Sequence, residues 1–105
     1  MNLLEETKLA MFNACKEPQD IVFIGSLESG ACCSWSEFEV LADQEYDCGF
    51  GGSEVAQNLV ICFEDGSRLI RAEYDGSEWW EFIDAFKEPE IKKPIHNLFT
   101  GWKDL

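Results

Sequence analysis

The sequence has few basic residues. Its 105 residues include eight Lys and Arg against 21 Asp and Glu, which gives a formal net charge of −13. Between Lys16 and Arg68 there are eleven acidic residues and no Lys or Arg. Proteins that follow a nucleic-acid backbone need Lys and Arg to displace its counterions, and anionic membrane surfaces attract the same side chains. We therefore expect no direct binding to nucleic acid and none to a membrane.

Metal-binding and disulfide patterns are absent as well. The five cysteines are odd in number, Cys32 and Cys33 are adjacent, and no CxxC pair occurs. The single histidine, His96, lies 34 residues after the last cysteine. Zinc sites need cysteine pairs and histidines at close spacing. We expect reduced thiols, as is usual in the cytosol, and no metal or other cofactor.

The sequence also lacks catalytic motifs. A Cys–His or Ser–His pair would have to use His96, which lies in a proline-flanked tail, and there is no G-x-S-x-G motif. Gly49–Gly52 lacks the Lys-Ser/Thr of a phosphate-binding loop and has acidic neighbours. A turn with positive φ accounts for these glycines. We expect no enzymatic activity.

No apolar run is long enough to span a membrane. The longest, Ile21–Ile24 and Leu59–Phe63, have four and five residues, and no secretory signal is recognisable at the N-terminus. Hydrophobic residues still make up 46% of the chain, including four Trp and eight Phe. A chain of this length forms one core. We expect one cytoplasmic domain over residues 1–86 and a proline-interrupted tail over 87–105 that packs back on it.

Local patterns predict an α+β fold. A first helix begins at the cap Asn2 and ends before Pro18. The capping-box pair Ser36 and Glu39 starts a second helix. The first helix should bury Leu4, Met11, Phe12 and Cys15, and the second Phe38, Leu41 and Ala42.

The strands should form one antiparallel sheet of four to five strands. Ile21–Ile24 is predicted as an inner strand and Ala31–Trp35 as another. The sheet ends in a three-stranded meander, because Asp-Gly turns join its last three apolar runs. A short helical turn over Ile95–Trp102 should pack back on the domain. The meander strands are Leu59–Phe63, Arg68–Tyr74 and Glu78–Ile83.

Acidic residues form two groups that can merge into one surface for a basic partner. One group follows the second helix and the other lies on the last hairpin. A merged acidic surface would raise the association rate with a basic partner. The alternative is that the charge serves only solubility. The adjacent Trp79 and Trp80 point to opposite faces of a strand. One joins the core, and the other is either covered by the tail or an interface anchor. The predicted partner-binding residues are Asp43, Glu45, Asp47, Glu54, Glu73, Asp75, Glu78 and Trp79.

Residues 20–80 resemble a known group of proteins. They carry DIVFIGS, SWSEFEVLAD, YDCGFGGSEVA and LVICFEDGSRLIRAEYDGSEWW, and EYDGSEWW is the most specific segment. These segments are similar to the small acidic immunity proteins of polymorphic nuclease toxins, including those of contact-dependent growth inhibition. The resemblance implies a cytosolic inhibitor that binds a basic nuclease toxin domain and has no chemistry of its own. We expect a monomer that forms a one-to-one complex.

Two other functions fit the charge. A nucleic-acid mimic from a mobile element would inhibit restriction or CRISPR effectors through a similar acidic surface. An acidic housekeeping domain would have no dedicated partner at all. The neighbouring genes separate these functions, since an immunity gene follows its toxin gene.

Overall fold

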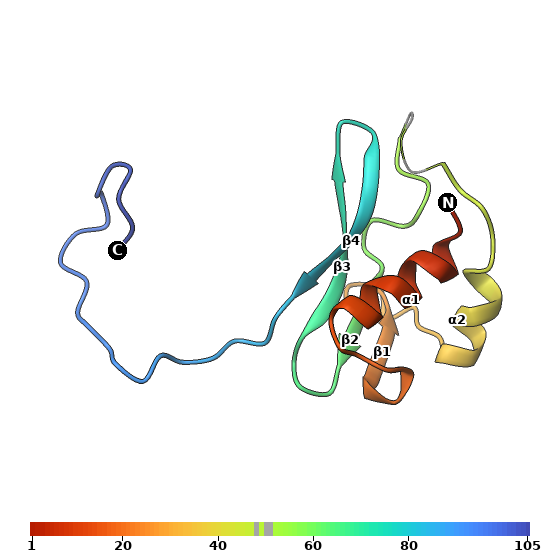
Figure 1. Ribbon diagram of the computed structural model, residues 1–105, viewed down its shortest axis with the longest axis horizontal. Coiled ribbons are helices and arrows are strands. Elements are labelled where there is room, and N and C mark those ends of the chain that lie inside the picture. The colour runs from red at the N-terminus through yellow and green to blue at the C-terminus, as the bar shows by residue number, and fades with distance from the viewer. Residues whose placement is uncertain (48, 50–51) are drawn as a thin grey trace.

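The fold consists of two helices and one antiparallel sheet (Figure 1). The structure is a computed structural model, and it describes residues 1–47, 49 and 52–105. The strand order β1-β2-β3-β4 follows the sequence, which confirms the predicted α+β fold and its meander. The elements are α1 (Leu3–Asn13), a 3-10 turn (Pro18–Asp20), β1 (Ile21–Gly25), α2 (Trp35–Leu41), β2 (Val60–Phe63), β3 (Arg68–Tyr74) and β4 (Ser77–Ile83).

The core lies between the helices and one face of the sheet. Helix α1 packs against β4 and α2 packs against β1. Ile24, Ile61 and Leu69 stand side by side on three strands and are at most 1% exposed. Trp80 closes the core from β4, and its indole Nε1 donates a hydrogen bond to Thr7 Oγ1 at 2.8 Å. Each large apolar side chain buried in this way contributes about 1.5–3 kcal/mol.

Helix α1 begins where predicted but buries a different face. The Asn2 side chain accepts a hydrogen bond from the Glu5 N–H at 3.0 Å. Met11 is buried as expected, whereas Phe12 and Cys15 are exposed. The helix ends at Asn13 and Cys15 has a φ of 58°, so helical spacing no longer applies to Cys15.

Strand β1 lies at the edge of the sheet, so the predicted inner position is wrong. The predicted strand Ala31–Trp35 is wrong too, because α2 begins at Trp35. What remains of that strand is one isolated bridge between Gly25 and Cys32. The bridge and a hydrogen bond from the Cys33 N–H to the Ile24 carbonyl cover part of the β1 edge. This partial cover explains why the apolar run Ile21–Ile24 can lie in an edge strand.

Ser34, and not Ser36, caps α2. Ser34 Oγ accepts from the Glu37 N–H at 3.1 Å, and the Glu37 carboxylate accepts from the Ser34 N–H at 2.9 Å. Hydrogen bonds to the Glu37 carboxylate from the Ser34 N–H and the Ser34 side chain lower the pKa of Glu37. With this start, Phe38 and Ala42 are buried as predicted, while Leu41 is exposed.

The cap can be tested with two serine variants. We expect Ser34→Ala to lower the free energy of unfolding by about 1 kcal/mol, because the first turn loses its side-chain acceptor. Ser36→Ala removes an exposed hydroxyl and should change it by less than about 0.5 kcal/mol. Urea unfolding of both variants measures the difference. A larger loss in Ser36→Ala would contradict the assigned cap.

The tail does not pack back on the domain. Residues 87–105 leave the end of β4 as an extended segment (Figure 1), and none of them belongs to a helix or strand. Phe99 and Trp102 are 91% and 103% exposed. Pro89 and Pro94 favour extended backbone at and before their positions, and charged residues separate them. The predicted C-terminal helical turn and the cover of Trp79 by the tail are therefore wrong.

Candidate protein-binding surface

Six of the seven predicted acidic residues are exposed on two neighbouring parts of the chain. The segment after α2 lies beside the β3–β4 turn, at the end of the sheet opposite the β2–β3 turn (Figure 1). Hydrogen bonds from two backbone N–H groups of this segment to the Glu78 carboxylate on β4 hold the two parts together. We call this surface the acidic end. It consists of Asp43, Glu45, Asp47, Glu54, Glu73 and Asp75.

Local contacts fix the acidic end while leaving its carboxylates exposed. Asn2 Nδ2 donates to Asp43 Oδ1 at 2.9 Å, and the N-terminal ammonium pairs with Glu45 at 3.0 Å. Glu54 accepts from the Asp47 N–H at 2.8 Å. The start of α1 and the loop itself thus hold the segment in place.

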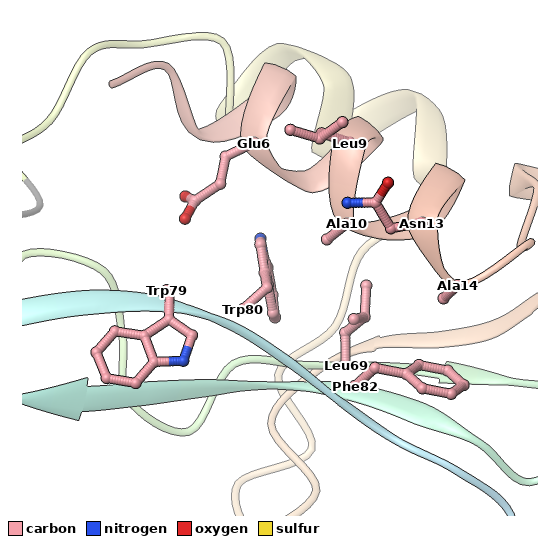
Figure 2. A pocket seen from close by; sticks show the side chains of 9 residues that line it. All are labelled: Glu6, Leu9, Ala10, Asn13, Ala14, Leu69, Trp79, Trp80 and Phe82. Atoms are coloured by element: carbon pink, nitrogen blue, oxygen red, sulfur yellow. The ribbon is translucent and has the colours of Figure 1, made fainter.

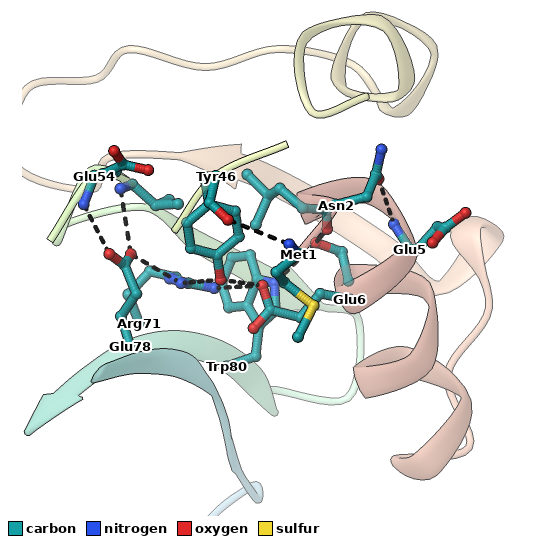
Figure 3. A network of polar contacts seen from close by, with 12 residues as sticks. Met1, Asn2, Glu5, Glu6, Tyr46, Glu54, Arg71, Glu78 and Trp80 are labelled. Carbon is teal, nitrogen blue, oxygen red and sulfur yellow. Dashed lines mark hydrogen bonds and ion pairs between the residues drawn. The ribbon is translucent and has the colours of Figure 1, made fainter. Parts of the chain in front are cut away.

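Glu78 does not belong to the acidic end. Its side chain is 2% exposed and forms an ion pair with Arg71 Nη2 at 3.0 Å. The same carboxylate accepts from the Glu54 N–H at 2.7 Å and the Val55 N–H at 3.2 Å (Figure 3). Glu78 therefore supports the loop and faces no partner. Glu78 and Trp80 are two residues apart in β4, so both side chains point to the inner face. This spacing is the feature of the sequence that could have predicted the buried position of Glu78.

Glu78 is part of a buried polar group that we call the Arg71 cluster: Glu6, Tyr46, Arg71 and Glu78. The Arg71 side chain is 3% exposed, and its Nη1 lies 3.4 Å from Glu6 Oε1. Its Nη2 donates to the Tyr46 hydroxyl at 3.1 Å, and its guanidinium carbon lies 4.9 Å from the centre of the Trp80 ring. No local pattern in the sequence identifies Tyr46 or Glu6 as partners of Arg71. The cluster joins α1, the segment after α2 and the last hairpin.

Tyr46 links the cluster to the stability of the protein at alkaline pH. Burial raises the pKa of Tyr46 to about 12, and the hydrogen bond from its hydroxyl to Glu6 Oε1 at 2.5 Å adds to this. In the unfolded chain a tyrosine has a pKa of about 10. The folded protein thus holds this proton more tightly. The resulting stability is complete below pH about 10 and is lost as the pH rises through about 12.

The absorbance of tyrosinate tests this assignment. We expect one tyrosine of the folded protein to ionise near pH 12, and Tyr46→Phe to remove that step. The variant should also lose less stability between pH about 10 and 12 than the natural protein, because it has no phenol to ionise there. A titration that Tyr46→Phe leaves unchanged would contradict the buried position of this hydroxyl.

Trp79 and Trp80 point to opposite faces, as predicted. Trp80 is 8% exposed and lies between α1 and the sheet, whereas Trp79 is 40% exposed. A groove of about 340 Å³ runs between α1 and β4, with Leu9, Trp79 and Phe82 among its lining residues (Figure 2). Trp79 is thus available to a partner on the same hairpin that carries Glu73 and Asp75.

The cysteines show no sign of a metal centre in the described part of the chain. Cys15, Cys32, Cys33 and Cys62 are free thiols, and burial raises the pKa of both Cys33 and Cys62. No three His, Cys, Asp or Glu among the described residues lie close enough together to hold a metal ion. Cys48, and the positive-φ turn predicted within Gly49–Gly52, involve residues 48, 50 and 51, which lie outside the described residues.

Comparison with known proteins gives no relative. No protein-family model matches the chain, and neither a curated protein nor a solved structure is similar to it. Among the residues that the structure describes, no helix is long and apolar enough to cross a membrane. A function must therefore be argued from the acidic end and the cluster that supports it.

Proposed function

We propose that the protein is a cytoplasmic immunity protein that binds a cognate basic nuclease toxin and blocks its nucleic-acid-binding or active-site surface. The observation that carries the proposal is the acidic end. Six exposed carboxylates come from two chain segments, and hydrogen bonds from the Glu54 and Val55 N–H groups to Glu78 and from Arg71 to Tyr46 hold those segments together. Acidic side chains take the place of the substrate phosphates, and no chemistry by the inhibitor is needed.

The rigidity of this surface matters as much as its charge. A nuclease presents Lys and Arg to the phosphates of its substrate. Carboxylates on a fixed backbone can pair with those side chains without a large loss of conformational entropy on binding. The Arg71 cluster supplies this fixed backbone, since Glu78 holds two consecutive N–H groups of the loop. Trp79 offers an exposed aromatic surface on the same hairpin.

The partner can be found by co-purification. We expect the tagged protein to retain the product of the gene directly upstream, co-expressed in a catalytically inactive form, as a complex with one inhibitor protomer per toxin. Recovery of no partner would contradict the proposal. Capture of a restriction or CRISPR effector would support the nucleic-acid-mimic alternative.

The kinetics of the complex should show electrostatic steering. With eighteen acids and four bases in residues 1–86, a net charge of −14, we expect the association rate to fall steeply as ionic strength rises. Dissociation should change little, because screening acts mainly on the approach of the partners. Surface-immobilised toxin at several salt concentrations gives both rates. An association rate independent of salt would mean that the charge serves solubility alone.

A further inference from the structure

One face of the sheet carries no helix. Both helices lie on the opposite face (Figure 1), and antiparallel sheets with one solvated face place polar residues there. In this protein the outward positions are mostly apolar instead. Strand register places eight apolar side chains on this face, which we call the open face: Phe23, Val60, Cys62, Ile70, Ala72, Tyr74, Trp79 and Ile83. Val60 is buried, and the other seven are at least partly exposed.

The open face is also nearly neutral in a strongly acidic protein. Among the strand residues on it, Arg68 and Glu81 are charged, one of each sign. A pocket of about 320 Å³ opens on this face between Ile70 and the loop residue Leu27. A neutral, apolar face with a pocket of this size suits an apolar partner that carries aromatic side chains.

The tail is a second apolar surface, and its large apolar side chains are exposed. Residues 87–105 carry four Lys and three acids, a net charge of +1, against −14 for residues 1–86. Exposed apolar surface gathered in one segment marks an interaction site. The large apolar side chains of the tail are all at least 59% exposed: Ile91, Ile95, Leu98, Phe99, Trp102 and Leu105.

We propose that the tail of one copy covers the open face of a second copy, and that the exchange is reciprocal in a two-fold dimer. The tail leaves β4 away from its own domain (Figure 1), and Pro89 and Pro94 keep the connector extended. Nineteen extended residues reach about 60 Å, enough to cross a second domain. The weakly basic tail meets no net repulsion from the acidic body of the other copy.

The dimer changes the expected state of the free protein from monomer to dimer. It does not depend on the proposed toxin, because the acidic end contains no residue of the open face and the two proposals share only Trp79. One toxin per protomer therefore remains compatible with a dimer of inhibitors.

Sedimentation equilibrium of the full chain tests the proposal with three variants. Phe99→Ser/Trp102→Ser changes fully exposed tail residues, and Ile70→Lys places a charge on the open face. Leu9→Ser, on α1 and 61% exposed, is the matched control. We expect the natural protein and Leu9→Ser to dimerise, and the tail and face variants to dissociate at least tenfold more readily.

Mixing gives the sharper result. An equal mixture of the tail variant and the face variant should form heterodimers, because one intact tail meets one intact open face. If Ile70→Lys unfolds, the dimerisation of Phe99→Ser/Trp102→Ser compared with that of the natural protein tests the proposal by itself. A natural protein that stays monomeric at all concentrations overturns the proposal, whether the tail then covers its own domain or binds only the toxin. Toxin binding is measured separately, so the two proposals can fail independently.

Discussion

Glu78→Lys is expected to lower the free energy of unfolding by about 3–5 kcal/mol or more, the largest effect of any single change considered. The substitution removes the carboxylate that pairs with Arg71 at 3.0 Å and places a second cation beside it. Removal of one partner from a buried ion pair leaves an uncompensated charge, which is strongly destabilising. The Glu54 and Val55 N–H groups lose their acceptor as well.

Glu73→Lys is the matched control. Glu73 is the cross-strand partner of Glu78 on the same hairpin, but it is exposed. Its reversal changes the net charge by the same amount and should alter stability by less than about 0.5 kcal/mol. Urea unfolding of both variants at one ionic strength gives the comparison. Equal losses would mean that the repulsion of the whole chain, and not the buried pair, sets the stability.

Reversal of two charges at the acidic end is expected to weaken toxin binding by about a hundredfold or more. Glu45→Lys/Glu73→Lys turns two attractions across the interface into repulsions, and like-charge contacts of this kind cost several kcal/mol. Both residues are exposed, and an exposed ion pair such as that of Glu45 with the N-terminal ammonium contributes only about 0–1 kcal/mol, so the double variant should fold with little loss of stability. Calorimetric titration with the inactive toxin measures the affinity.

The control for this prediction carries the same charge change at the other end of the sheet. Glu17→Lys/Glu64→Lys alters exposed residues near the β2–β3 turn, where Lys16 pairs with Asp65 and the Glu64 N–H donates to the Asp20 carbonyl. We expect it to bind much more tightly than the first double variant. If both lose affinity equally, net charge alone drives binding and the acidic end is not the interface.

The elements that sequence predicted well are those set by local chemistry. Asn2 caps α1 because its side chain reaches an N–H three residues away. The Asp75-Gly76 turn has positive φ at both residues, 51° and 83°, as a tight hairpin requires. The similar turn at residues 65–66 has positive φ at Gly66 but not at Asp65. The shared Asp-Gly-Ser sequence therefore predicted both hairpins, but it did not predict that the backbone conformations of the two turns differ.

The start of α2 is a feature that the sequence left open. Ser34–Glu37 and Ser36–Glu39 both match the capping box, and the structure forms the first pair. Local pattern alone cannot choose between these two pairs.

Glu78 illustrates the same limit for the candidate site. In the sequence, Glu78 lies near an exposed turn, as Glu73 does. In the structure it is buried, because it pairs with Arg71 and accepts hydrogen bonds from N–H groups of a loop more than twenty residues away. Six of the seven predicted acidic residues lie on exposed surface because exposure of charge is the common case. The seventh, Glu78, is buried and holds the loop of the acidic end through its hydrogen bonds.

Inhibition of the toxin's nuclease activity is the most direct measurement of the central claim. Increasing amounts of the protein are added to a fixed amount of the active toxin, and cleavage of its nucleic-acid substrate is followed. The account predicts that cleavage ends at one protomer per toxin, that excess substrate relieves the inhibition, and that Glu45→Lys/Glu73→Lys fails to inhibit while Glu17→Lys/Glu64→Lys succeeds. Full cleavage in the presence of excess natural protein, or equal inhibition by both double variants, would contradict it.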